Sequence, residues 1–150
     1  MPHSDVHCPL HYIFSTKRRR NLILPDFREK LWAYMGGIAR VNKIPALAVG
    51  GMGDHAHVVL SLNSTTSIAK AIQLVKGGSS KWVRETFPAA GDFEWQEGYS
   101  AYAVSESLLD NVRDYIARQE EHHRKMTFEE EYIAFLEKHG IPYDRRHLFD

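Results

Sequence analysis

Residues 53–62 read Gly-Asp-His-Ala-His-Val-Val-Leu-Ser-Leu, and this stretch decides how the chain folds. Its run of β-branched and other apolar residues predicts a buried strand. Because side chains alternate across a strand, His55 and His57 share one face, while Ala56 and every second residue after it point into a core. Two imidazoles on one strand face can hold a metal ion. An apolar core would leave each with a ring nitrogen that needs a partner.

The spacing of the two histidines does not by itself establish a metal site. The chain contains nine histidines, and a surface pair or a hydrogen-bonded pair explains one His-x-His equally well. To interpret the pair as part of a catalytic metal site, a third ligand and a reacting group must be found elsewhere in the sequence.

The composition is that of an ordinary globular domain. The 150 residues are 43% apolar and 25% charged, and residues 1–150 are expected to form one domain. The single cysteine, Cys8, excludes an intramolecular disulfide and fits a reducing compartment. No apolar run reaches the ~20 residues of a membrane helix, and the first residues lack the apolar core of a signal peptide. We therefore expect a cytoplasmic protein without a membrane partner.

Basic residues are concentrated in blocks, although 19 basic and 19 acidic residues give a net charge of zero. Zero net charge argues weakly against a nucleic-acid binder. One block is Lys17, Arg18, Arg19 and Arg20, and a looser one contains Lys76 and Lys81. Such segregation can leave a basic face on a neutral protein, and solvated surface charge is the alternative for each block taken alone.

The order of expected elements defines the fold class. Strands are expected at residues 10–15, at 44–49 and from 55 onward. The second and third of these would pair as a hairpin. One or two more strands are expected between residues 93 and 104. A helix opened by Pro25 and capped by Asp26 follows the first strand, and a second, interrupted at Gly77-Gly78, follows the hairpin. This order predicts an α+β fold: a ferredoxin-like split β-α-β-β-α-β antiparallel sheet with helices on one face. Further helices follow Ser105 and Thr127, the latter with a Glu130 capping box.

Tyr115 and Gln119 lie four residues apart on the first of these C-terminal helices and so share a face. A tyrosine can be a covalent nucleophile, and attack on a phosphodiester would need a cation nearby. The amide oxygen of Gln119 could complete a site begun by His55 and His57, and such a mixed nitrogen and oxygen set suits Mg²⁺ or Mn²⁺. Ordinary packing of the tyrosine and a surface glutamine are the alternative.

Several motifs together resemble the HUH-type single-tyrosine transposases of the insertion-sequence 200/605 group, over nearly the whole chain. The matching pieces are HYIFSTKRR (11–19), MGDHAH (52–57), VKGGSS (75–80), WQEGY (95–99), YIARQ (115–119), FEEEY (128–132) and HGIPYD (139–144). Gly53 replaces a usual proline, and Ala56 is smaller than the common valine; neither change removes a candidate ligand. A related repeat-associated branch carries an Asn-Pro-Val-Arg type motif after the tyrosine helix. This chain has Glu-Glu-His-His at 120–123 instead, which favours the insertion-sequence branch.

The resemblance implies a homodimer that cuts and rejoins single-stranded DNA at transposon ends through a 5′-phosphotyrosine intermediate. It also implies recognition of a subterminal DNA hairpin, and metal histidines of one subunit often served by the tyrosine helix of the other. In this chain Tyr115 would be the nucleophile, and the basic residues named above would contact the DNA backbone. The alternatives are a non-catalytic or domesticated binder of single-stranded or hairpin DNA, or a ferredoxin-like dimer that binds a small ligand or metal. The complete set of His55, His57, Tyr115 and Gln119 favours the enzyme.

Overall fold

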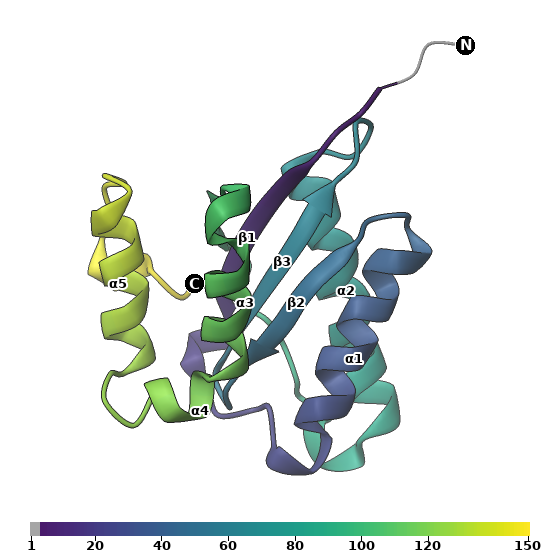
Figure 1. The fold of residues 1–150 in the computed structure, drawn as a ribbon. Helices are drawn as coiled ribbons and strands as arrows, with labels where there is room; N and C mark the ends of the chain where they lie inside the picture. Colours follow the sequence, from purple (N-terminus) through teal and green to yellow (C-terminus); the bar gives the residue numbers. More distant parts are fainter. Residues whose placement is uncertain (1–3) are drawn as a thin grey trace.

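Four strands form one antiparallel sheet in the order β2-β3-β1-β4. Figure 1 shows β2, β3 and β1 side by side in this order. The computed structural model describes residues 4–150. The strands are β1 (Cys8–Ser15), β2 (Ala46–Gly51), β3 (His55–Leu62) and β4 (Ser100–Ala103). Every residue of β3 is buried, because it is flanked by β1 and β2 and covered on both faces. The ferredoxin-like order and the predicted hairpin of β2 and β3 are both confirmed.

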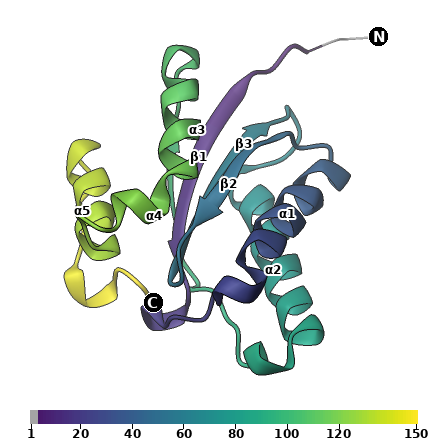
Figure 2. The ribbon, with the colours of Figure 1, turned by 60° about the horizontal axis from the view of Figure 1, so that its bottom comes forward.

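Two helices, α1 (Pro25–Val41) and α2 (Ile68–Thr86), pack on one face of the sheet and bury the main core (Figure 2). The core side chains of β3 on this face are those that alternate with the histidines, from Ala56 to Leu62. The α1 helix begins after Leu24 with Pro25 in its first position, so the prediction that Asp26 caps it is wrong. A proline fills that first position well because its missing N–H would have no intrahelical partner.

The α2 helix runs without a break through Gly77-Gly78, which corrects the predicted interruption there. Ser67 caps its start by accepting a hydrogen bond from the backbone N–H of Lys70. A Cβ atom on Gly78 would lie 2.9 Å from Ile38 Cδ1 of α1. The glycine therefore allows the two helices to approach closely, and this packing outweighs its low helix propensity.

Three shorter helices cover the other face of the sheet: α3 (Leu109–Ala117), α4 (Gln119–His122) and α5 (Phe128–Lys138). The α3 helix packs on β2 and β3 through Leu109 and Ile116, while α5 packs on β1 and β4. Thr127 and Glu130 form the predicted capping box at the start of α5. Because His55 and His57 point to this face, the C-terminal third of the chain buries them.

The remaining differences from the predicted elements are small. Residues 93–104 provide only β4 and an isolated bridge between Thr16 and Trp95, and β2 starts at Ala46. Short 3-10 turns occur at Lys17–Arg19, Pro88–Ala90, Glu106–Leu108 and Arg145–His147. Within residues 4–150, no helix has both the length and the apolar character that crossing a membrane requires.

Gly50 of β2 sets how closely α3 approaches the sheet, and its replacement by alanine is expected to destabilise the fold. An added Cβ would lie 2.8 Å from Ile116 Cγ2 and 3.0 Å from the Ile116 carbonyl oxygen. Overpacking of this kind costs about 1–3 kcal/mol, measured as a lower free energy of unfolding in urea. Gly37→Ala is the matched control, because nothing lies within 4 Å of its Cβ. A Gly50→Ala protein as stable as wild type would contradict this packing.

Candidate functional site

His55 and His57 lie side by side on β3, with no exposed surface, beneath the C-terminal helices. Tyr115 lies on α3 and Gln119 at the start of α4. The Tyr115 ring is 5.7 Å from the His57 ring, and the Gln119 Oε1 atom is 2.9 Å from His55 Nε2. The fold thus brings together the four residues that the sequence singles out as a nucleophile and metal ligands.

The helix that was expected to carry both Tyr115 and Gln119 is interrupted between them. The α3 helix ends at Ala117, and Arg118 has φ −105° and ψ 28°, outside the helical region. Gln119 nevertheless stays close to its predicted neighbour, because its Nε2 donates to the Tyr115 carbonyl oxygen at 3.3 Å. This hydrogen bond directs the amide oxygen of Gln119 toward the histidines.

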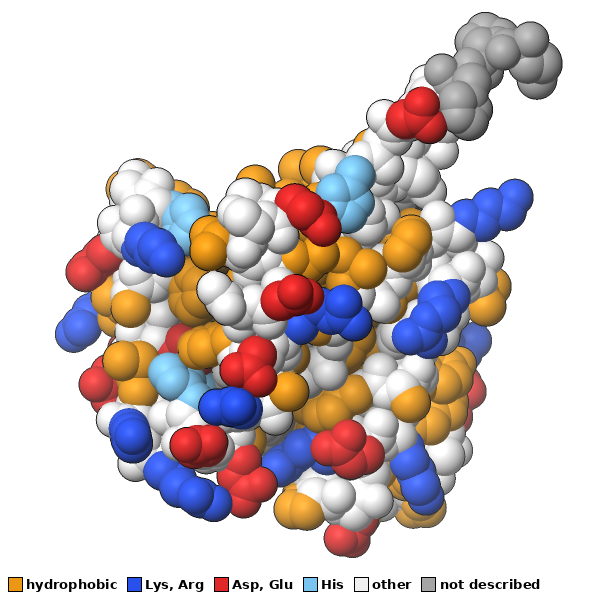
Figure 3. Space-filling model, in the orientation of Figure 1, with side chains coloured by type: hydrophobic (Ala, Val, Ile, Leu, Met, Phe, Trp, Pro, Cys, Tyr) orange, Lys and Arg blue, Asp and Glu red, His pale blue; other side chains and the backbone are white. Residues whose placement is uncertain are grey.

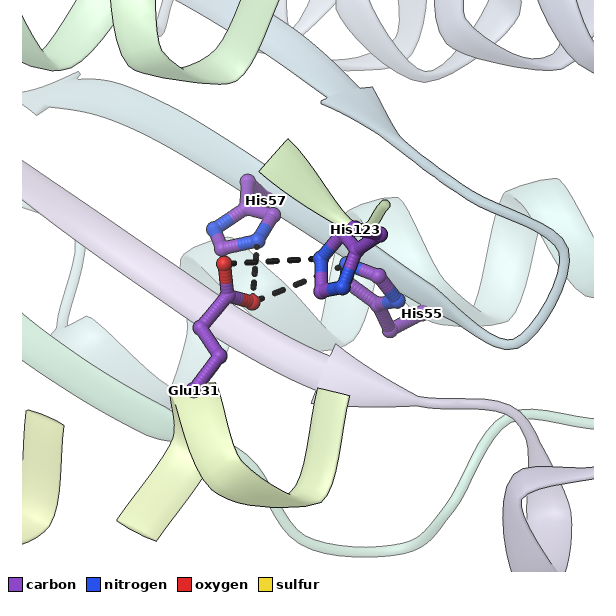
Figure 4. A group of neighbouring side chains, drawn as sticks. All are labelled: His55, His57, His123 and Glu131. Carbon is purple, nitrogen blue, oxygen red and sulfur yellow. Dashed lines mark hydrogen bonds and ion pairs between the residues drawn. The ribbon is translucent and has the colours of Figure 1, made fainter. Parts of the chain in front are cut away.

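Two residues that the sequence reasoning missed, His123 and Glu131, complete the cluster (Figure 4). One ligand-type atom from each of His55, His57, His123 and Glu131 lies within 4.8 Å of all the others. Glu131 is only 1% exposed, and its Oε1 accepts a hydrogen bond from His57 Nε2 at 3.0 Å. A signal was present in the sequence: residue 131 falls among the apolar positions of α5, where an unpaired carboxylate would be costly.

The hydrogen bonds around the cluster fix which ring nitrogen of two histidines carries its proton. His55 Nδ1 lies 2.8 Å from Asp54 Oδ1, a carboxylate oxygen that can only accept. His123 Nδ1 donates to the carbonyl oxygen of Met126 at 2.8 Å. In the neutral form of both rings, Nε2 therefore presents a lone pair toward Gln119.

His11 on β1 is the hydrogen-bond partner of the second ring nitrogen of His57. His11 Nε2 and His57 Nδ1 lie 2.8 Å apart, and both rings are buried. Burial lowers the pKa of each imidazole below its ordinary value, and in His57 it outweighs the opposing effect of Glu131. Each ring is therefore neutral at pH 7, with one nitrogen to donate and one to accept.

Tyr115 and Glu131 are in direct contact, with the phenol donating to Glu131 Oε2. Burial, followed by the charge of Glu131, raises the pKa of Tyr115 well above its ordinary value. Burial alone would raise the pKa of Glu131, but hydrogen bonds from His123 and His57 outweigh it and hold this pKa well below its usual range. The resting site therefore contains a protonated phenol and an ionised carboxylate.

A cavity of about 360 Å³ opens beside Tyr115. Its walls also include His122, whose Nε2 lies 3.0 Å from the Tyr115 hydroxyl oxygen, and the cations Arg118 and Lys125. The tyrosine is half-buried, whereas the histidines of β3 are fully enclosed. A molecule entering this cavity from solvent therefore meets Tyr115 and His122 before the histidines of β3.

The basic block at 17–20 follows β1 directly and lies close to the site. Ser15 pairs with His55, so the end of β1 is next to the start of β3. Arg18 and Arg19 have φ values of 57° and 56°, a left-handed conformation uncommon for residues other than glycine. The Arg19 guanidinium lies 5.0 Å from the centre of the Phe149 ring, and Arg20 forms an ion pair with Asp92.

Lys76 and Lys81 lie on α2, on the opposite face of the sheet from the histidines. Lys76 Nζ donates to the carbonyl oxygens of Glu97 and Gly98, at 3.2 and 2.8 Å. Burial lowers the pKa of this ammonium group to about 8. On the face drawn in Figure 3, basic and acidic side chains are interspersed, so no continuous basic patch covers the C-terminal helices.

The chain is similar to known transposases in sequence. A family model described as "Transposase IS200 like" matches residues 4–119. The transposases for insertion sequence element IS200 of Salmonella typhimurium strain LT2 and Salmonella typhi are each 24% identical to it over 127 residues. Each match covers 79% of this chain and 81% of the relative.

The fold is also found in solved structures. A candidate transposase of Deinococcus radiodurans R1 superimposes with a TM-score of 0.62 at 24% identity, covering 79% of this chain and 96% of that one. A REP-associated tyrosine transposase, solved bound to a REP hairpin, gives a TM-score of 0.59 at 15% identity, covering 82% and 72%. With the family model spanning most of the sequence, this chain belongs to the IS200-like transposase family.

Proposed function

We propose that this member of the family is a metal-dependent transposase that cleaves and rejoins single-stranded DNA at transposon ends. One observation carries the proposal: Gln119 contacts His55, and Tyr115 contacts His57, beneath the C-terminal helices. The two pairs are about 60 residues apart in the chain. A nucleophile beside a set of nitrogen and oxygen ligands is the arrangement that phosphodiester cleavage requires.

Tyr115 is the proposed nucleophile. Its oxygen would form a bond to phosphorus, and the bond between phosphorus and the 3′ oxygen of the DNA would break. The products are a 5′-phosphotyrosine and a free 3′ hydroxyl. The hydrogen bond to Glu131 holds the phenol in place; its proton is released to solvent as the bond to phosphorus forms, and the departing 3′ oxygen takes up a proton from solvent. Rejoining reverses the step, since a 3′ hydroxyl attacks the phosphotyrosine and releases Tyr115.

His55, His57 and Gln119 are the proposed ligands of a divalent cation, Mg²⁺ or Mn²⁺. The donor set fits, because two imidazole nitrogens and an amide oxygen converge from two sides of a buried space. Such an ion, when bound, would neutralise charge on the phosphate under attack. On the wall of the cavity beside Tyr115, Lys125 would attract the DNA backbone to the phenol, as would Arg118 once it leaves its ion pair with Asp114.

The proposed substrate is single-stranded DNA with a subterminal hairpin, bound by a homodimer whose chains each use residues 1–150 as one domain. One structural relative was solved with a REP hairpin, which supports a hairpin partner here. Of the proposed backbone contacts, Lys17, Arg18, Arg19 and Arg20 lie nearest to the site. Lys76 and Lys81 would have to contact a part of the DNA that reaches the other face, and Lys76 would first have to leave its carbonyl partners.

Replacing Tyr115 by phenylalanine tests the nucleophile. The change removes one oxygen, so the fold and hairpin binding should persist while the covalent protein–DNA adduct disappears. The measurement is a denaturing gel of protein incubated with labelled single-stranded oligonucleotide and Mn²⁺. Tyr143→Phe is the matched control, because Tyr143 is exposed and lies in the tail after α5. Mapping of a trapped adduct to Tyr99 or Tyr132 would overturn the assignment.

Replacing His57 by alanine tests the metal site. Loss of one imidazole should reduce metal-dependent cleavage by at least ~100-fold, since even the loss of groups that orient metal ligands costs 10–100-fold. Binding of a labelled hairpin, measured by fluorescence anisotropy, should stay within about twofold of wild type. The exposed His147 provides the control variant His147→Ala. If the double variant His55→Ala, His57→Ala cleaves DNA at the wild-type rate, the assignment of these residues as metal ligands is wrong.

Neutralising Arg18 and Arg19 tests the proposed DNA contacts. Each phosphate contact contributes about 0.9 to the slope of log K against log salt, so the double alanine variant should flatten it by roughly 1 to 2. Lys30→Ala is the control, because Lys30 is exposed on α1, away from the site. An unchanged slope in the double variant would mean that these arginines are ordinary solvated surface charges.

A further inference from the structure

When the rings of His55 and His123 are neutral, their Nε2 atoms and the Gln119 Oε1 atom converge as hydrogen-bond acceptors with no proton between them. The Nδ1 protons of His55 and His123 are given to Asp54 and to the Met126 carbonyl oxygen. Their Nε2 lone pairs therefore face the Gln119 Oε1 atom, at 2.9 and 3.0 Å. Lone pairs at this separation repel unless a cation or an added proton lies among them.

Turning the amide of Gln119 does not resolve this conflict. A turned amide would offer N–H groups to both imidazoles. Its oxygen would then face the carbonyl oxygen of Tyr115, at the position where Nε2 now lies 3.3 Å away as a donor. The arrangement therefore calls for a positive charge supplied from outside these side chains.

The distances fit one metal ion. With metal–ligand bonds of about 2.1 Å, adjacent ligand atoms lie roughly 3.0–3.5 Å apart and opposite ones roughly 4.2 Å. His57 Nε2 and His55 Nε2 lie 3.0 and 3.7 Å from Glu131 Oε1, and His123 Nε2 lies 3.5 Å from Glu131 Oε2. Glu131 and His123 therefore lie at separations from the histidines of β3 and from each other that ligands of one ion can have.

We propose that His123 and Glu131 are ligands of the same ion as His55, His57 and Gln119, an inference that rests on the proposed function. Both residues follow the last residue matched by the family model, Gln119, so the C-terminal segment would be part of the metal centre. Three imidazoles, a carboxylate and an amide oxygen favour Mn²⁺ over Mg²⁺, because Mg²⁺ prefers an all-oxygen octahedron.

Two further contacts agree with this assignment. The second oxygen of Glu131 accepts the hydrogen bond of Tyr115, so one side chain would position the nucleophile relative to the ion. His57 donates through Nε2 to Glu131 in this structure. To bind an ion there, the His57 proton moves to Nδ1 and the His11 proton moves from Nε2 to its own Nδ1, so that His11 Nε2, 2.8 Å away, accepts from His57.

Titration of the full chain with MnCl₂ or MgCl₂ alone, by calorimetry and without DNA, tests the proposal. Wild type should bind one Mn²⁺ at least tenfold more tightly than Mg²⁺. Glu131→Gln and His123→Ala should each weaken Mn²⁺ binding at least ~10-fold, by analogy with the loss of groups that support ligands. Glu129→Gln makes the same charge change on the partly exposed side of α5 and should bind Mn²⁺ as wild type does. Circular dichroism checks the fold, and Glu131→Gln keeps the side-chain volume.

The outcomes separate this inference from the proposed function. If His57→Ala loses Mn²⁺ while Glu131→Gln and His123→Ala bind it as wild type does, only the inference fails. Glu131 would then be the counter-ion of a protonated imidazole. If wild type binds no Mn²⁺, or His57→Ala binds it unchanged, the proposed metal site on β3 fails as well. Equal affinity of wild type for Mn²⁺ and Mg²⁺ would overturn the predicted metal preference.

Discussion

The structure depends on the alternation of side chains along β3. The residues from Ala56 onward that face α1 and α2 complete an apolar core, and this packing fixes the register of the central strand. The same register commits His55 and His57 to the other face, where both are fully buried. Buried imidazoles need polar partners, so α3, α4 and α5 must bring hydrogen-bonding groups to that face as well as apolar ones. As a consequence, a cluster of polar side chains lies between the sheet and the C-terminal helices.

Much of the fold could be predicted because its signals are local. Alternation in β3, the Pro25 start of α1 and the capping box at Thr127 each depend on residues a few positions apart. The predicted break in α2 was wrong because distant packing decides the local structure there. The α2 helix passes through Gly77-Gly78 because Gly78 packs against Ile38 of α1, a contact that no local pattern reveals.

The candidate site divides in the same way. His55 and His57 follow from strand spacing, and Tyr115 and Gln119 from helical spacing, although the helix breaks at Arg118. His123 and Glu131 could not be found from spacing, because the turn between α4 and α5 sets their position relative to β3. The one available sign was a carboxylate among the apolar residues of α5, and its meaning depends on knowing that the facing surface carries histidines. The basic block at 17–20 was easily seen, but only the pairing of Ser15 with His55 places it beside the site.

The central claim is that one face of the sheet and the C-terminal helices build a single metal and tyrosine site. The most direct measurement is the anomalous diffraction of crystals of the protein soaked in MnCl₂. We predict one strong anomalous peak, with His55 Nε2, His57 Nε2 and Gln119 Oε1 about 2.0–2.3 Å from the ion and Tyr115 beside it. A peak elsewhere on the molecule, with none between β3 and α4 in well-ordered crystals, would contradict it.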